Sequence, residues 1–264
     1  MESNKAHYLF FDVETNGPSP TNNSMFSIGM VITDKDHNIL GEKYSTCHID
    51  CEQISDNYIK PKGKSVIKVD KDNWPMEAQN VHKITWREQL TYQHPIDMCR
   101  EIYSFIAKFD SDLVMVFHAN TPFDIRFLMN HFFRWTEKGY YLIQKFIKFD
   151  RYEGTMQMAR EYVRNGKDIF KQSEKLQKTI DKMQGYLTRE RKTPASPAKV
   201  LEWKQKKDDA ILELSSLNVE SSVSFDGVSL DKICRALEIP LDHHNAMSDA
   251  KALVPIHKFL KANL

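Results

Sequence analysis

The sequence predicts an α/β fold with a mixed sheet and a parallel central pair of strands. Three observations lead to this prediction: two strand-like runs around a turn-rich stretch near the start, a short apolar run at 113–117, and helical periodicity on both sides of that run. Strand, helix, strand, helix in that order is typical of parallel strands joined by a crossover helix. At 264 residues with 41% hydrophobic residues, the chain can form one large domain, or one domain with an insertion.

The first three strands are expected at 7–13, 25–33 and 39–49. Asn, Gly, Pro and Ser residues separate the first two, which suits an antiparallel pair. A polar turn at 34–38 leads into the third strand.

Helices are expected on either side of the apolar strand at 113–117. Residues 95–109 carry apolar side chains at the spacing of an amphipathic helix. The next helix should begin near Pro122, because proline fits the first turn of a helix. Phe123, Phe127 and other apolar residues of that helix are expected to face inward.

Two more helices are expected near the end of the chain. Ser229 can cap a helix that runs through Glu238. His244 or Asn245 then opens a last helix that reaches Leu260, with apolar residues along one side.

Residues 166–219 differ in character from the rest of the chain. They are rich in Lys, Gln and Glu, a Pro- and Ser-containing stretch at 193–197 interrupts them, and both halves place apolar residues at helical spacing. We therefore expect a helical hairpin inserted into a domain formed by 1–165 and 220–264. An excess of Lys and Arg in it fits an arm that binds nucleic acid or a protein partner, but also a solvated spacer or lid.

Charge and cysteine content exclude some classes of protein. The 37 basic and 36 acidic residues give a net charge of +1, so the overall charge does not indicate a nucleic-acid partner. No CxxC pair, signal peptide or membrane-length apolar run is seen, which favours a reducing intracellular, for example cytoplasmic, location and no membrane partner. Cys47 and Cys51 form only a weak zinc pattern, and idle thiols are the alternative.

Asp12 and Glu14 end the first strand. Because side chains alternate along a strand, both carboxylates lie on one face. Two like charges at the mouth of a core need a compensating cation, and oxygen ligands suit Mg²⁺ or Mn²⁺. The alternative is a strand that ends in solvent with two ordinary surface acids.

Asp124 and Asp249 each follow a loop and fall in the early turns of a helix. Asp124 comes after the 113–117 strand, and the carboxyl ends of parallel strands meet at one edge of a sheet. His244 lies just ahead of the helix of Asp249, and a histidine beside carboxylates and a metal can act as general base on water. Helix-dipole and capping roles are the alternatives for these three residues.

Together these residues meet the needs of phosphodiester cleavage. The reaction uses one metal to orient a hydroxide, a second to stabilise the leaving oxygen, and a base for the proton of the water. Two ions require several shared carboxylates, and four acids and one histidine are present.

The chain resembles the DEDDh 3′→5′ exonucleases of the ribonuclease-H-like superfamily. The resemblance covers residues 7–163 and 226–261 in order, and His244, four intervening residues ahead of Asp249, marks the h subclass. It rests on five segments: Asp12-Val13-Glu14-Thr15-Asn16-Gly17, Val81-His82-Lys83-Ile84-Thr85, the stretch with His118, Asn120, Phe123 and Asp124, Thr155-Met156-Gln157-Met158-Ala159-Arg160, and His244 with Asp249.

The resemblance implies a ribonuclease-H-like fold with a mixed five-stranded sheet and two Mg²⁺ or Mn²⁺ ions. Asp12, Glu14 and Asp249 would hold one ion, Asp12 and Asp124 the other, and His244 would be the base. The substrates would be DNA or RNA 3′ ends. The residues expected to contact the terminal nucleotide are Thr15, Asn16, Asn120, Phe123 and Phe127, although core packing is the commoner fate of helical phenylalanines.

Two departures from the family pattern leave the five catalytic positions untouched, and the first of them leaves the substrate class and the partners open. The 166–219 hairpin is not part of the compact pattern, and Asp150 is displaced from Thr155 by intervening residues. Two other functions remain open: a non-catalytic nucleic-acid-binding or polymerase-associated module of the same fold, and a phosphoesterase that acts on small nucleotides. A position of Asp124 or Asp249 remote from Asp12 would exclude the metal site.

Overall fold

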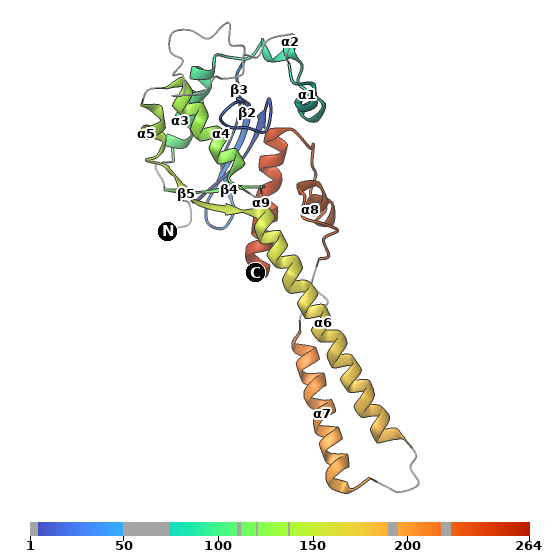
Figure 1. Ribbon diagram of the computed structural model, residues 1–264. Helices are drawn as coiled ribbons and strands as arrows, with labels where there is room; N and C mark the ends of the chain where they lie inside the picture. Colours follow the sequence, from blue (N-terminus) through green and yellow to red (C-terminus); the bar gives the residue numbers. More distant parts are fainter. Residues whose placement is uncertain are drawn as a thin grey trace. The chain divides into compact units, whose positions relative to one another are not determined.

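A computed structural model of the protein describes residues 5–49, 74–109, 112–119, 121–136, 138–189, 195–217 and 223–264 (Figure 1). The chain divides into two compact units. Unit 1 comprises Met1–Ala159 and Asp226–Leu264, and unit 2 comprises Arg160–Phe225. Among the described residues, no helix combines the length and the apolar character of a membrane span.

Unit 1 is built on a mixed five-stranded sheet in the order β3-β2-β1-β4-β5. β1 is antiparallel to β2 and parallel to β4, so the predicted parallel central pair and the five-stranded sheet are confirmed. β3 continues the antiparallel side and β5 the parallel side. The strands are β1 (Tyr8–Thr15), β2 (Met25–Thr33), β3 (Ile39–Thr46), β4 (Leu113–Phe117) and β5 (Ile147–Gly154).

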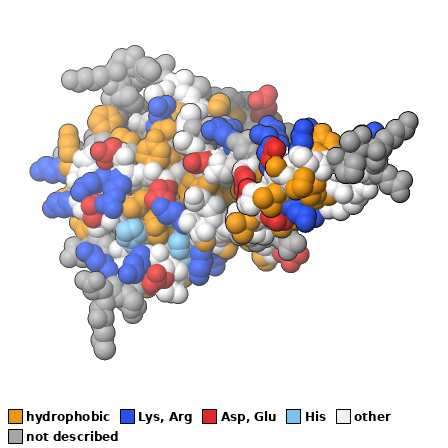
Figure 2. Space-filling model, turned by 90° about the horizontal axis from the view of Figure 1, so that it is seen from below, with side chains coloured by type: hydrophobic (Ala, Val, Ile, Leu, Met, Phe, Trp, Pro, Cys, Tyr) orange, Lys and Arg blue, Asp and Glu red, His pale blue; other side chains and the backbone are white. Residues whose placement is uncertain are grey.

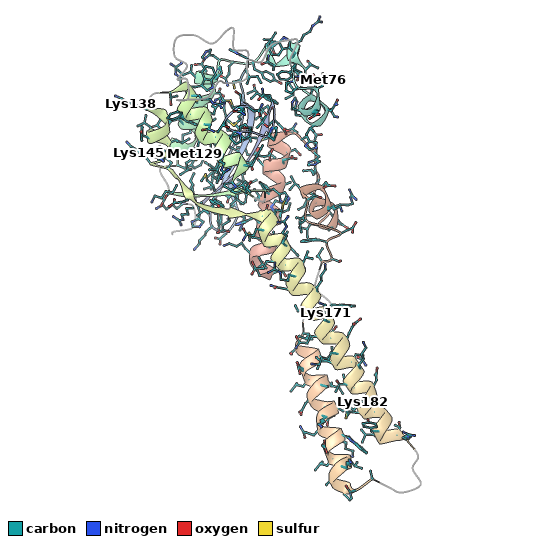
Figure 3. All side chains as sticks on the ribbon, in the orientation of Figure 1. Met76, Met129, Lys138, Lys145, Lys171 and Lys182 are labelled. Atoms are coloured by element: carbon teal, nitrogen blue, oxygen red, sulfur yellow. The ribbon has the colours of Figure 1, made fainter. Side chains whose placement is uncertain are left out.

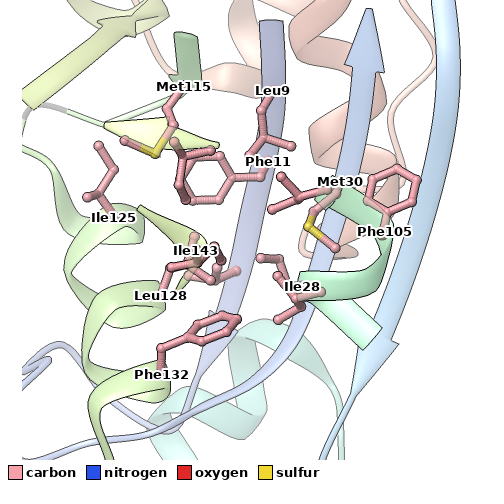
Figure 4. Packing of buried hydrophobic residues seen from close by; sticks show 14 of the residues in the cluster. Leu9, Phe11, Ile28, Met30, Phe105, Met115, Ile125, Leu128, Phe132 and Ile143 are labelled. Carbon is pink, nitrogen blue, oxygen red and sulfur yellow. The ribbon is translucent and has the colours of Figure 1, made fainter. Parts of the chain in front are cut away.

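Helices cover both faces of this sheet. Leu9 and Phe11, on one face of β1, pack in the main core with apolar residues of α3 (Pro95–Ala107) and α4 (Phe123–Trp135), as Figure 4 shows for the α4 side chains. Phe10 faces the other way and contacts the ring of His257 in α9 (Ala246–Asn263). Alternate side chains of β1 thus pack against two different helical layers, one on each face of the sheet.

Several elements differ from the sequence prediction. The third strand ends at Thr46 instead of residue 49; the next residue, Cys47, still donates to the carbonyl oxygen of Phe26 on β2 at 2.8 Å, but it also bridges to Gln93. α8 (Leu230–Ala236) stops before Glu238, whose positive φ of 56° is incompatible with a continuing helix. The short helices α1 (Met76–His82), α2 (Trp86–Gln89) and α5 (Gly139–Ile143) lie where no element was expected.

Unit 2 contains most of α6 (Thr155–Thr188) and all of α7 (Pro197–Ser216). Contacts between the helices run in opposite directions along the chain: Gln172 donates to Glu213, and the ring of Tyr186 lies 5.2 Å from that of Trp203. The pair is therefore antiparallel, and its first helix begins at Thr155 and continues through the expected boundary at 166. A Cβ atom added to Gly166 would meet no described atom within 4 Å, and the helix continues through this residue.

Cys47 is buried, and its thiol lies 3.6 Å from the carbonyl oxygen of Met25. Burial raises the pKa of this thiol well above its usual range, so the thiolate needed for zinc is disfavoured in the metal-free protein. Cys51, the other half of the weak zinc pattern, lies outside the described residues.

Candidate active site

The carboxylates predicted from the sequence line one cavity of about 310 Å³ in unit 1. β1 contributes Asp12 and Glu14, α4 contributes Asp124, and α9 contributes Asp249. The cavity is lined by Asp12, Val13, Glu14, His118, Ala119, Phe123, Asp124, Met156, Ser229, Leu230, His243, His244 and Asp249.

Carboxylate oxygens of Asp12, Glu14 and Asp249 lie within 4.8 Å of one another. Such a spacing lets one cation contact all three. Asp124 is outside this group, yet its charge contributes to the raised pKa of Asp12 and both residues line the same cavity. Asp249 is therefore close enough to Asp12 to share an ion with it, and Asp124 lines the same cavity.

Local structure fixes each carboxylate. Asp12 and Glu14 are alternate residues of β1, beside the carboxyl end of β4, and Glu14 is buried. Asp124 lies in the first turn of α4. Asp249 lies in the first turn of α9, which Asn245 caps by accepting hydrogen bonds from the amides of Met247 and Ser248, both at 3.2 Å.

Burial and mutual repulsion hold protons on this cluster. Burial, with the charges of Asp124, Glu14 and Asp249, raises the pKa of Asp12 well above its usual range. Burial, followed by repulsion from Asp249 and Asp124, raises the pKa of Glu14 to about 8. Burial raises the pKa of Asp124 to about 7 and that of Asp249 to about 6. A divalent cation would remove the repulsion, because opposite charge favours the ionised form.

The unused oxygen of Asp249 also fits a cation. Asp249 Oδ1 is buried and has no hydrogen-bond donor among the described residues, whereas Oδ2 accepts from the backbone amide of His244 at 3.3 Å. Buried polar atoms without a partner are rare. The donor set of oxygens at close spacing thus suits Mg²⁺ or Mn²⁺.

Two adjacent histidines border the carboxylates. Their rings stack with centroids 3.8 Å apart, and His243 Nδ1 lies 3.5 Å from Asp249 Oδ2. His244 has a φ of 66°, an uncommon backbone conformation for a residue with a side chain. Burial and the neighbouring His243 lower the pKa of His244, so its imidazole is unprotonated near neutral pH. The sequence indicated His244 and missed the contact of His243 with Asp249.

His118 also lines the cavity and contacts two of the segments around it, although it was not among the site residues predicted from the sequence. Its Nε2 donates to the carbonyl oxygen of Val228 at 3.0 Å, and its Nδ1 lies 2.9 Å from the hydroxyl of Thr155. It therefore joins the end of β4, the start of α6 and the segment before α8. Ser229, which lines the same cavity, was read from the sequence only as a helix cap.

The predicted substrate contacts are placed differently from one another. Phe123 lines the cavity, whereas Phe127 is buried in the main core. Thr15 donates to the carbonyl oxygen of Gly17 at 2.9 Å, and buried Asn16 accepts from the amide of Ser24 at 2.7 Å, so both shape the turn after β1. Asn120 lies outside the described residues.

Comparison with known proteins places this geometry in context. The sequence profile of the family RNase T, described as "Exonuclease", matches residues 9–185. Comparison with curated proteins gives no significant match. Solved structures of E. coli exonuclease I share the fold: a zinc-bound complex with single-stranded DNA has a TM-score of 0.55 at 16% identity, covering 97% of this chain and 40% of that chain.

Two other structures of exonuclease I, the first of them from E. coli, give similar values. The complex with a dT13 oligonucleotide has a TM-score of 0.55 at 15% identity, covering 97% of this chain and 41% of that chain. The structure said to suggest how processivity is achieved has a TM-score of 0.53 at 16% identity, with the same coverage. The chain thus spans less than half the length of these structures.

Proposed function

Because this chain belongs to the RNase T family of exonucleases, we propose that it removes nucleotides one at a time from the 3′ ends of DNA or RNA strands and releases nucleoside 5′-monophosphates. The single observation that supports this activity most strongly is the close group of carboxylate oxygens from Asp12, Glu14 and Asp249. Asp124 lines the same cavity, and His244 borders it.

Four carboxylates would hold two Mg²⁺ or Mn²⁺ ions. Asp12, Glu14 and Asp249 would contact the ion nearer the attacking water, and Asp12 and Asp124 would contact the other. Ions of this kind lower the pKa of bound water and stabilise the attacking and leaving oxygens of an in-line displacement. Loading the site would replace the proton that burial and repulsion favour on Glu14 and the proton that burial favours on Asp124.

His244 would accept the proton of the attacking water. A general base must be unprotonated at working pH, and burial together with His243 lowers the pKa of His244 in that direction. His243, 3.5 Å from Asp249 Oδ2, would instead position that carboxylate. Phe123, which lines the cavity, would contact the terminal nucleotide.

The test is incubation of end-labelled single- and double-stranded DNA and RNA with Mg²⁺ or Mn²⁺. The chain is expected to produce a ladder of products shortened from the 3′ end. Asp12→Ala and His244→Ala should abolish the ladder. Asp36→Ala is a matched control, because it removes an exposed acid that does not line the cavity, and it should cleave like the parent protein.

The same assay separates the other two functions. Binding of every strand without cleavage would indicate a non-catalytic nucleic-acid-binding or polymerase-associated module. Hydrolysis confined to free nucleotides would indicate a phosphoesterase. Since the E. coli exonuclease I complexes contain single-stranded DNA, single-stranded DNA is the first substrate to test.

A further inference from the structure

A row of basic side chains runs along one side of α6 in unit 2. Successive members are three or four residues apart, which places them on one face of a helix with 3.6 residues per turn. All are exposed, and none forms an ion pair with another described residue. This row, called the basic stripe, consists of Arg160, Arg164, Lys167, Lys171, Lys175, Lys178 and Lys182.

The opposite side of α6 packs on α7. Met183 is buried on this side, whereas Tyr186, four residues after Lys182, contacts Trp203 at the edge of the helix pair and has the Nζ of Lys182 5.9 Å from its ring. Lys207 of α7 donates to Gln184. The hairpin therefore covers the apolar side of α6 and leaves the basic stripe toward solvent. Figure 3 labels Lys171 and Lys182 along the helix.

Charge is divided unevenly between the two units. Unit 2 has 14 Lys and Arg against 10 Asp and Glu, and the rest of the chain has 23 against 26. The net charges of +4 and −3 cancel to the +1 of the whole chain, which is why whole-chain charge conceals the basic region. On the face drawn in Figure 2, basic side chains accordingly appear in several places with acidic ones between them.

Two surface hollows meet at Lys171. Lys171, Lys175, Lys178 and Lys182, with Glu174 and Thr179, line one of about 380 Å³. The other, of about 420 Å³, is largely apolar and is bordered by Lys167, Lys171 and Phe170. The side chain of Phe170 is 58% exposed. An exposed aromatic ring between cations is the combination that stacks a base beside its phosphates.

We propose that the basic stripe binds the phosphodiester backbone of a single nucleic-acid strand and that the hollow at Phe170 receives its bases. The stripe extends over 22 residue steps, roughly 33 Å of helix, which is long enough to follow several consecutive phosphates. A duplex would offer the same phosphates but keep its bases paired, so the apolar hollow favours a single strand. The choice of nucleic acid over other polyanions rests on the proposed exonuclease function.

Other partners fit the observations less well. A helix that lies on a membrane surface inserts its apolar face, and that face of α6 is packed on α7. An acidic protein would satisfy the lysines but would leave the apolar hollow unused. The site is separate from the cavity of unit 1, and it would raise the local concentration of strands for the attached catalytic unit.

The test measures binding of the full chain to a labelled dT20 strand by fluorescence anisotropy in EDTA, over a range of salt concentrations. The triple variant Lys171→Gln, Lys175→Gln, Lys178→Gln should weaken binding roughly tenfold or more and reduce the salt slope by about 2, because each lost phosphate contact of a single strand removes about 0.7 from that slope. Phe170→Ser should weaken binding without changing the slope.

A matched control removes the same charge from α7. Lys199→Gln, Lys204→Gln, Lys206→Gln changes three exposed lysines outside the stripe and should bind dT20 nearly like the parent chain. Equal losses in the two triple variants would overturn the proposal, because net charge alone would then explain binding. The proposal would also be overturned if the stripe variant bound dT20 normally but no longer bound phosphatidylserine vesicles or poly-glutamate, because the stripe would then serve a membrane or an acidic protein.

Hydrolysis of a trinucleotide in Mg²⁺ keeps this proposal separate from the catalytic one. A trinucleotide is too short to cover the stripe, so the stripe variant should cleave it at the parent rate. If the stripe variant cleaves the trinucleotide and binds dT20 like the parent chain, the proposed binding site on the stripe is refuted and the proposed exonuclease activity stands. If the parent chain cleaves no substrate but binds dT20, and the stripe variant loses that binding, the proposed binding site is supported and the proposed exonuclease activity is refuted.

Discussion

Gly29 lies directly against Ala246: a Cβ atom added to Gly29 would overlap the backbone of Ala246 at the start of α9. Gly29 is also the register partner of Asp12 on β1. The first turn of α9 carries Asp249. The absence of a side chain at this one strand position therefore lets the helix approach the sheet and brings Asp249 to Asp12.

Gly29→Ala is expected to destabilise the protein and to impair the site together. The methyl group meets backbone rather than a flexible side chain, so α9 must shift, and overpacking of this kind costs about 1–3 kcal/mol. Thermal unfolding should report the loss of stability. Metal affinity, measured by Mn²⁺ titration, should fall because Asp249 moves away from Asp12.

Gly166→Ala is the matched control for that substitution. Gly166 lies within α6, and an added Cβ would meet nothing within 4 Å. Alanine in a helix interior is favoured over glycine by about 0.5–1 kcal/mol, so this variant should be slightly more stable and retain Mn²⁺ affinity. If Gly29→Ala behaved in the same way, the proposed close approach of α9 would be wrong.

Glu14→Gln should weaken the loss of stability that the metal-free protein shows as pH rises. Burial and the charges of Asp249 and Asp124 raise the pKa of Glu14 from 4.5 to about 8. The folded protein then binds this proton more tightly than the unfolded chain, so stability falls as pH rises from about 4.5 to about 8. In EDTA, the variant should match the parent melting temperature near the acid end of this window and exceed it near the alkaline end.

Mg²⁺ should cancel the advantage of Glu14→Gln at alkaline pH, since the parent chain gains the ion that the variant holds less well. Glu101→Gln provides a control of opposite sign. Burial raises the pKa of Glu101, but hydrogen bonds from Ser45 and Gln93 and the ion pair with Lys43 outweigh it and the pKa is lowered. The parent therefore gains stability as pH rises through this pKa, and the Glu101→Gln variant should fall below the parent in stability over the same range. A Glu14→Gln melting temperature that never exceeds the parent value would argue against carboxylate repulsion.

Local pattern was sufficient to predict the parallel central pair and the shared face of Asp12 and Glu14, because these depend on apolar runs and on the period of a strand. The fifth strand was implied only by the family resemblance, since Lys148, Asp150 and Arg151 interrupt its apolar pattern. The contact of Gly29 with α9 links residues far apart in the chain. No local signal encodes it, although it determines where Asp249 lies.

Arg134 is expected to stabilise the turn that follows β1. Its guanidinium is buried and donates to the carbonyl oxygens of Asn23, Pro20 and Thr21 at 2.6, 2.9 and 2.7 Å. Arg134→Met would leave these oxygens without that donor, at a cost of about 3 kcal/mol in the free energy of unfolding. Urea unfolding measures this cost.

Arg126→Met, on the exposed side of the same helix, should leave the urea midpoint almost unchanged. Limited proteolysis adds a local readout, because only the loss of Arg134 should expose the turn at 16–24 to cleavage. Equal urea midpoints for the two variants would show that the buried guanidinium contributes little to this turn.

His244→Asn should lower kcat by about 10²–10⁴-fold, the usual contribution of a general base, while the affinity for the strand stays close to that of the parent chain. His243→Asn should be milder, because His243 contacts Asp249 Oδ2 rather than the reacting water. It should also move the acid limb of the kcat profile to higher pH. His243 lowers the pKa of His244, so its removal raises the pH at which His244 becomes unprotonated. If instead His243→Asn abolished turnover and His244→Asn did not, His243 would be the base.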